Sequence, residues 1–189
     1  LFPIQLFGNH NLENISAAFQ ICTLMGVKKV DFFDAIKSFK GADNRLELIH
    51  KSNSSFVYKD FAHSPSKVKA TVNAVKLQYP NKKLIVAFEL HTYSSLNPIF
   101  IKKYRDTLKN ADECVISFSE KNMKIKGFHP IGHKLIIDAF NHKKIHVVTD
   151  LISFEKTLFS FDLSNTVLLL MSSGNFNGFD YKKIKKILK

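Results

Sequence analysis

The stretch "KLIVAFEL" at residues 83–90 decides the fold of this chain. Its apolar residues are almost continuous, which is typical of a strand that is buried on both faces. Helical patterns flank this stretch at residues 65–79 and 98–108. A buried strand between two helices indicates a parallel sheet with helices on both of its faces.

The alternation of strands and helices continues along most of the chain. Two strand-like runs flank the polar turn at residues 51–54, which predicts a hairpin or a pair of strands that lie near each other. We therefore expect an α/β fold: a Rossmann-like, mostly parallel sheet with helices on both faces over residues 44–189, preceded by a short helical tail over residues 1–43. The other predicted strands are 45–50, 55–61, 113–118, 145–148 and 166–171, and the other predicted helices are 10–25, 30–39, 134–140, 151–159 and 181–189.

The chain carries a net charge of +12 over 189 residues. This favours a polyanionic partner such as nucleic acid, a nucleotide phosphate or an acidic metabolite. The densest basic run, "YKKIKKILK" at 181–189, has the apolar spacing of a surface helix with one buried stripe. That spacing favours a solvated face, so we expect no nucleic-acid partner and keep a basic nucleic-acid-binding α/β module as an alternative.

The targeting signals and the cysteines restrict the class of protein. No signal peptide and no apolar run near about 18 residues is present, so we expect a cytoplasmic protein without a membrane partner. Cys22 and Cys114 have neither metal-ligand spacing nor the density of a disulfide framework. The chain begins with Leu1 where a complete gene product would begin with Met, so we expect a fragment of a longer polypeptide.

Three polar segments follow predicted strands: "KDFAHSP" at 59–65, "ELHTYSS" at 89–95 and "SSGNFNG" at 172–178. In open α/β sheets, ligands bind beyond the carboxyl ends of the strands. These segments are therefore the first places to look for a site.

The first segment allows several kinds of chemistry. Asp60 and His63 could form an acid/base pair, ligate a metal, or divide into a nucleotide-binding aspartate and a substrate-binding histidine. A structural alternative is that Asp60 caps the helix that begins near Pro65. The residues alone do not choose between these interpretations.

Two other segments are similarly open. "GNHNLEN" at 8–14 places Asn11 and Asn14 one helical turn apart, where their amides could bind the edge of a base or simply cap the helix. The segment 172–178 offers backbone N–H groups that could hold a carboxylate or phosphate, or it is a turn that needs positive φ. No phosphate loop, zinc-binding H-E-x-x-H or G-x-S-x-G motif occurs, so the chain does not look like a complete catalyst.

Three segments, taken in order, resemble the Mur ligases, which join amino acids or peptides to UDP-N-acetylmuramate with ATP. "GNHNLENISAA" at 8–18 is similar to the family's G-x-H-N-x-x-N-x-x-A-A helix near the end of the central ATPase domain. "FKGADNRLE" at 39–47 is similar to its F-x-G-x-x-x-R-x-E junction, and "KDFAHSPSKVKAT" at 59–71 to its D-[FY]-[AG]-H-x-P signature. The resemblance implies that residues 1–43 end the central domain and residues 44–189 form the C-terminal domain.

The resemblance also implies roles for individual residues. ATP would be bound by Asn11 and Asn14 on the adenine side and by Arg45 and Asp60 near the ribose and phosphates. The acceptor side of the cleft would be formed by His63, Ser64, His91, Thr92, Ser95, Ser173, Gly174 and Asn175.

The implied reaction activates the muramyl carboxylate as an acyl phosphate, which the amine of the acceptor attacks. The cofactors would be ATP and Mg²⁺, with the Mg²⁺ ligands and the phosphate loop in the upstream domains of the same polypeptide. We assign no catalytic residue to this fragment and expect it to be inactive alone. It would supply a closing lid and the acceptor pocket.

The expected acceptor follows from positions where this sequence differs from the motifs of the alanine-adding members. Alanine-adding members have a P-H-R-Y-T-R segment, and Thr92 and Ser95 stand here where its arginines would be. Ser64 replaces a second histidine of those members. The segments are nearer to members that use the tripeptide L-alanyl-γ-D-glutamyl-meso-diaminopimelate. We expect that acceptor, with L-alanine as the alternative.

Overall fold

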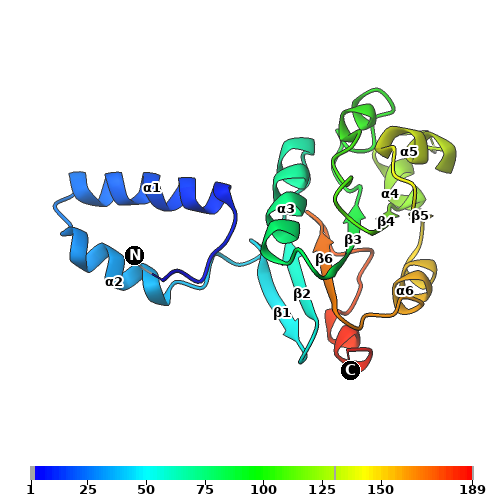
Figure 1. The fold of residues 1–189 in the computed structure, drawn as a ribbon. Helices are drawn as coiled ribbons and strands as arrows, with labels where there is room; N and C mark the ends of the chain where they lie inside the picture. The colour runs from blue at the N-terminus through cyan, green and yellow to red at the C-terminus, as the bar shows by residue number, and fades with distance from the viewer. Residues whose placement is uncertain (1–2, 130, 189) are drawn as a thin grey trace.

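A single six-stranded sheet organises residues 44 onward (Figure 1). The computed structural model describes residues 3–129 and 131–188. The strands lie in the order β1-β2-β6-β3-β4-β5; β1 and β2 form an antiparallel hairpin and every other neighbouring pair is parallel. The predicted fold class is therefore confirmed. The strands are β1 Glu47–Lys51, β2 Phe56–Asp60, β3 Lys83–Glu89, β4 Glu113–Ser117, β5 Ile145–Val148 and β6 Thr166–Met171.

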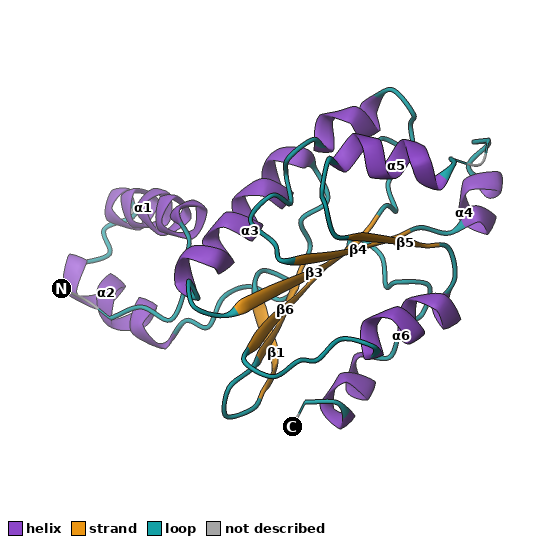
Figure 2. Ribbon diagram, turned by 45° about the vertical axis from the view of Figure 1, so that its right-hand side comes forward, coloured by secondary structure: helices purple, strands orange, loops and turns teal. Residues whose placement is uncertain are grey.

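Helices cover both faces of the sheet (Figure 2). One face carries α3 (Pro65–Gln78), α5 (His133–Phe140) and the 3₁₀ helix η1 (Phe100–Tyr104), which share one apolar core. The other face carries α6 (Leu151–Phe159) and the 3₁₀ helix η2 (Tyr181–Lys186), which share a second core.

The burial of β3 on both faces explains why its sequence is almost continuously apolar. Val86 and Phe88 point into the first core, whereas Ile85 and Ala87 point into the second. All four side chains are fully buried. Side chains alternate between the faces of a strand, so a strand covered on both faces needs apolar residues at every position.

Two helices at the start of the chain, α1 (Asn9–Leu24) and α2 (Lys29–Ser38), lie beside the β1–β2 edge of the sheet domain (Figure 1). They pack on each other through Phe19, Phe32 and Phe33, whose rings lie 5.2–5.4 Å apart. Phe32 is the one buried residue among those the structure describes in these two helices. This helical pair therefore has almost no core of its own.

Two predicted helices differ from the structure. The segment predicted as a helix at 98–108 forms only η1, because Asp106 adopts a left-handed φ of 60° and its N–H donates to the carbonyl of Phe140 instead. The last segment is also 3₁₀, although Ile184 of its predicted apolar stripe is buried. A short helix, α4 (Glu120–Ile125), was not predicted; the hydroxyl of Ser119 caps it by accepting from the Asn122 N–H at 3.2 Å.

Within the described part of the chain, no helix has both the length and the apolarity needed to cross a bilayer.

Candidate functional site

The three polar segments lie close together at the carboxyl ends of neighbouring strands. β6 lies between β2 and β3, so the segments that follow these strands emerge side by side. Met171 at the end of β6 is paired with Asp60 on one side and with Phe88 on the other. The sheet order therefore confirms that these segments lie together at the carboxyl ends of the strands, where ligands bind in α/β folds.

A cavity of about 620 Å³ opens where the helical pair faces the end of β2 and the start of α3. This volume lies in the range of small-molecule sites, about 300–1,000 Å³. All four residues predicted to bind ATP line it, although they come from three separate stretches of chain: α1, the junction before β1 and the end of β2. They are Asn11, Asn14, Arg45 and Asp60.

Asp60 is fixed in this cavity by its own hydrogen bonds. Its side chain is 4% exposed. One carboxylate oxygen accepts from the Ala62 N–H at 2.7 Å and from the Thr71 hydroxyl at 3.4 Å, and the other accepts from the Leu46 N–H at 2.8 Å. Asp60 therefore does not cap α3. It ties the end of β2 to the junction that leads back to α2.

The junction has an unusual backbone. Asn44 and Leu46 adopt left-handed φ angles of 56° and 46°, on either side of Arg45. Such angles are costly for a residue like leucine, and they persist only where the surroundings enforce them. Here the Leu46 N–H is held by Asp60, and the Asn44 carbonyl accepts from the Phe61 N–H at 2.8 Å. The result presents the exposed Arg45 to the cavity, with its guanidinium 5.7 Å from the Phe61 ring centre.

The lining of the cavity suits a nucleotide. Ile15, Ile36 and Phe39 give it an apolar wall on the side of the helical pair. Arg45 and Lys67 add positive charge on the other side. An apolar wall can contact a base and cations can contact phosphates. The Asn11 amide donates to the Phe7 carbonyl at 2.8 Å, which leaves its oxygen as an acceptor.

Two residues of the predicted acceptor side lie at the start of α3. The carbonyl of His63 accepts from the buried Tyr104 hydroxyl at 2.5 Å, and its ring lies 5.3 Å from the ring of Phe61. Ser64 is the N-cap residue of α3, but its side chain makes no capping hydrogen bond. Both side chains are half-buried at the same strand end as Asp60. His63 and Asp60 are thus neighbours without a hydrogen bond between them in the described structure.

His91 is the point where the other two segments meet. Its Nδ1 lies 3.7 Å from the carboxylate of Glu89. A Cβ atom added to Gly174 would lie 2.8 Å from the same Nδ1, so the backbone of the 172–178 segment approaches the imidazole closely. Only a residue without a side chain permits that approach. The predicted residues His91 and Gly174 are therefore in contact.

Glu89 is a residue that our sequence analysis did not single out. It is 2% exposed and ends β3. Its carboxylate accepts a short hydrogen bond from the Ser172 hydroxyl and one of 2.9 Å from the Phe176 N–H. Burial, and secondly the negative charge of Glu89, raises the pKa of Tyr181 to about 12. A carboxylate at the end of an otherwise apolar strand was the signal that could have revealed it.

The remaining predicted acceptor residues differ in how available they are. Ser95 is buried and its hydroxyl donates to the Thr92 carbonyl at 2.9 Å, which closes a turn. The Thr92 hydroxyl contacts that of Ser94 at 3.1 Å. The Ser173 hydroxyl is buried with no partner among the described residues. Asn175 is exposed, and its side chain accepts from the Gly178 N–H at 3.0 Å.

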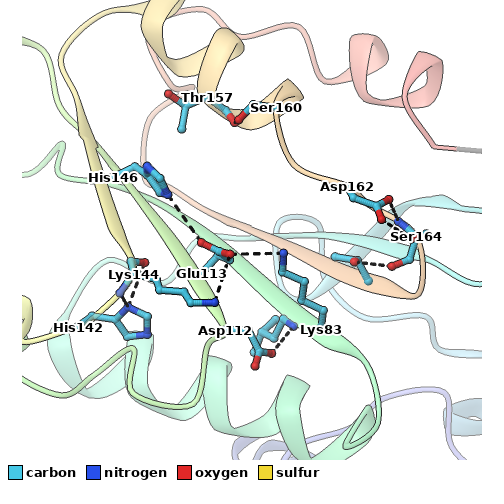
Figure 3. Close-up of polar contacts among 12 residues, drawn as sticks. Lys83, Asp112, Glu113, His142, Lys144, His146, Thr157, Ser160, Asp162 and Ser164 are labelled. Carbon is cyan, nitrogen blue, oxygen red and sulfur yellow. Dashed lines mark hydrogen bonds and ion pairs between the residues drawn. The ribbon is translucent and has the colours of Figure 1, made fainter.

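The amino ends of the strands, on the opposite side of the sheet from these segments, carry ion pairs. Figure 3 shows Glu113 with Lys83, Lys144 and His146 around it, at 3.5, 3.8 and 3.7 Å. This group lies at the start of β4, away from the segments described above. Across the described residues, no group of three or more His, Cys, Asp or Glu side chains has an arrangement that could hold a metal ion.

The comparisons with known proteins point to one group of enzymes. No family model matches the chain. It is 29% identical over 181 residues to the UDP-N-acetylmuramate–L-alanine ligase of Agathobacter rectalis, which covers 93% of this chain and 38% of that protein. The chain spans between 24% and 38% of the length of the curated relatives it matches.

Solved structures agree on the fold. The UDP-N-acetylmuramate–alanine ligase of Thermotoga maritima matches with a TM-score of 0.73 and 22% identity, over 92% of this chain and 36% of that one. A murein peptide ligase from Psychrobacter arcticus matches with a TM-score of 0.69 and 20% identity, over 98% of this chain and 38% of that one. At these identities the structures support the fold alone.

Proposed function

We propose that this chain belongs to the Mur ligase family and that it is the C-terminal part of an ATP-dependent amide-forming ligase of peptidoglycan synthesis or recycling; its fold, which matches solved ligases of this kind, and its sequence relatives support the proposal. The full-length protein would join an amino acid or peptide to UDP-N-acetylmuramate. The curated relatives are ligases of this kind by name. Residues 1–43 would complete the central ATPase domain, and residues 44–189 would form the C-terminal domain.

One observation carries this proposal: Asn11, Asn14, Arg45 and Asp60 line a single cavity. The asparagines would contact the adenine of ATP, and Arg45 would contact its phosphates. Asp60 would act chiefly by holding the junction that presents Arg45, since both of its oxygens already accept hydrogen bonds. ATP would transfer its γ-phosphoryl group to the muramyl carboxylate with release of ADP, and the acceptor amine would then displace phosphate from the acyl phosphate; the Mg²⁺ ligands would lie in the upstream domains.

For the acceptor, we propose the tripeptide L-alanyl-γ-D-glutamyl-meso-diaminopimelate. Thr92 and Ser95 lack the charge that a pocket for a small amino acid would use, and the hydroxyl of Ser95 is spent in its own turn. L-Alanine is the second candidate, because curated relatives that the chain matches are named as L-alanine ligases. His63, Ser64, His91, Ser173, Gly174 and Asn175 would line the acceptor side in either case.

The test is an assay of the full-length protein with ATP, UDP-N-acetylmuramate and either acceptor, with the amide product measured by mass spectrometry. We expect product with the tripeptide and a lower kcat/KM with L-alanine. Equal or better use of L-alanine would replace the first acceptor by the second. No ATP-dependent product with either one would overturn the proposed function itself.

Nucleotide binding has its own test. Asn14→Ala should raise the KM for ATP about fivefold to a hundredfold, the loss expected for one polar contact of about 1–3 kcal/mol. Glu13→Ala, an exposed neighbour on α1, is the matched control and should leave it unchanged. An unaltered KM for ATP in Asn14→Ala would remove this residue from the proposed site.

A further inference from the structure

Lys126 places a positive charge on the segment that seemed to lack one. It follows α4 directly, and α4 is the helix that the sequence did not predict. Its ammonium group donates a short hydrogen bond to the carbonyl of His91 and lies 5.1 Å from the Tyr93 ring centre. A cation from a distant part of the chain thus lies against the 89–95 segment, where arginines are absent.

This lysine differs from the paired lysines of the molecule. Lys76, Lys83 and Lys183 each lie beside a carboxylate. Lys126 is half-buried, and its contacts within the described residues are a neutral carbonyl and an aromatic face, without a carboxylate. Partly removing an ammonium group from water without an anionic partner is unfavourable, so such a group is receptive to a carboxylate ligand. Two of its three N–H groups remain for that ligand.

The buried carboxylate nearby does not fulfil this role. Glu89 accepts from Ser172 and Phe176 and faces the imidazole of His91. Lys126 contacts the backbone carbonyl of His91, whereas Glu89 lies beside the His91 imidazole. Glu89 and Gly174 therefore fix His91 in place, and the carbonyl of His91 in turn positions the ammonium group.

The sheet order gives the distance that a ligand would cover. Asp60 ends β2 and His91 follows β3, with β6 between them. Met171 of β6 pairs with both Asp60 and Phe88, so two interstrand spacings of about 4.8 Å place Phe88 about 10 Å from Asp60, and His91 follows three residues later. Three extended residues also span about 10 Å, whereas one residue spans less than 4 Å, roughly. If the acceptor amine reacts near the cavity at β2, as the proposed function requires, a single amino acid is too short to bring a carboxylate to Lys126, whereas an extended peptide of three residues or more approaches it.

We propose that Lys126 is a specificity-determining residue that binds a carboxylate at the far end of an extended peptide acceptor. This inference rests on the proposed function and refines its acceptor side. Lys126 would act in binding and not in the chemical step. It would favour the tripeptide over L-alanine because only the tripeptide brings a carboxylate to this point.

The test compares Lys126→Ala, Lys126→Arg and Lys124→Ala in the full-length protein. Lys126→Ala should raise the KM for the tripeptide about tenfold or more, the loss of one charge-assisted hydrogen bond. The KM for ATP and kcat should change less than about twofold, and the weaker use of L-alanine should not change. Lys126→Arg should recover most of the loss, and Lys124→Ala, an exposed position on α4, should match the wild type.

A tripeptide whose diaminopimelate carboxyl groups are converted to carboxamides separates charge from packing. The wild type should bind it about as weakly as Lys126→Ala binds the natural tripeptide, and Lys126→Ala should no longer discriminate between the two. A normal tripeptide KM in Lys126→Ala, with wild-type ligation intact, would overturn the role of Lys126 alone. A wild-type protein that ligates neither acceptor would instead remove the proposed function and this inference with it.

Discussion

The two ends of the sheet use their carboxylates in different ways. At the carboxyl end, Asp60 and Glu89 close β2 and β3, are 4% and 2% exposed, and are held by N–H groups and hydroxyls. At the amino end, Asp112 precedes β4 and Glu113 begins it, and their neighbours include lysines and a histidine (Figure 3). Asp112 is also far more exposed, at 45% of its side chain.

The buried carboxylates act by fixing the geometry of the backbone around them, whereas the exposed ones act through their charge. A buried carboxylate bonded to neutral donors cannot move without leaving those donors unpaired, so it fixes the shape of its surroundings. Ion pairs in contact with water are screened and contribute little. The carboxyl end of the sheet is therefore the rigid end, and it is also where the proposed ATP and acceptor sides lie.

The strongest test of this contrast is Asp60→Ala. It would leave the N–H groups of Leu46 and Ala62 without their acceptor and release the left-handed junction. We expect the free energy of unfolding to fall by about 2–4 kcal/mol, as for broken buried polar contacts. Because the chain has no Trp, urea unfolding is best followed by far-UV circular dichroism. Asp138→Ala on the exposed side of α5 is the control, and an equal loss in both variants would contradict the contrast.

Glu89→Gln tests the second buried carboxylate. The amide keeps one oxygen for the Phe176 N–H but loses the charge that strengthens the Ser172 bond. We expect a loss of about 1–2 kcal/mol in urea unfolding. Its effect should also reach His91, so the chemical shifts of that imidazole should move in NMR spectra. Unchanged stability together with unchanged His91 shifts would show that Glu89 positions nothing.

Asp112→Asn tests the amino end and should have the smallest effect. Burial alone raises the pKa of Asp112, but the Leu84 N–H and the Lys76 ammonium outweigh it and hold that pKa below its ordinary value. A lowered folded pKa means that the carboxylate stabilises the fold above its unfolded pKa of 3.8 and loses this contribution as the pH falls through the folded value.

The asparagine keeps an acceptor for Leu84 and loses only the ionic part. At pH 7 the variant should be less stable by no more than about 1 kcal/mol after screening by solvent. The difference should close as the pH falls through the folded pKa of Asp112, and it should shrink at 1 M NaCl. A difference that is independent of both pH and salt would show that Asp112 acts through packing.

The sequence predicted the site unevenly. Asn11, Asn14, Arg45 and Asp60 could be named from their motifs, and the cavity brings them together. Glu89 lies in the predicted segment at 89–95, but a Glu at the end of a strand does not reveal from the sequence whether it is buried. Lys126 could not be found, since the short helix that precedes it depends on a cap and on one buried side chain, Met123.

The sequence by itself determined the order of strands and helices, the parallel sheet and the three segments that follow its strands. These features come from local hydrophobic periodicity, which can be read along the chain. The tertiary structure alone decided which groups donate hydrogen bonds to Asp60, that the Ser95 hydroxyl closes a turn, and that the Lys126 ammonium group contacts the His91 carbonyl. Glu89 and Ser172, which are in contact, are separated by 83 positions in the sequence, and Lys126 and His91 are separated by 35. Partners at such separations depend on how the strands are ordered in space, and no local pattern encodes that order.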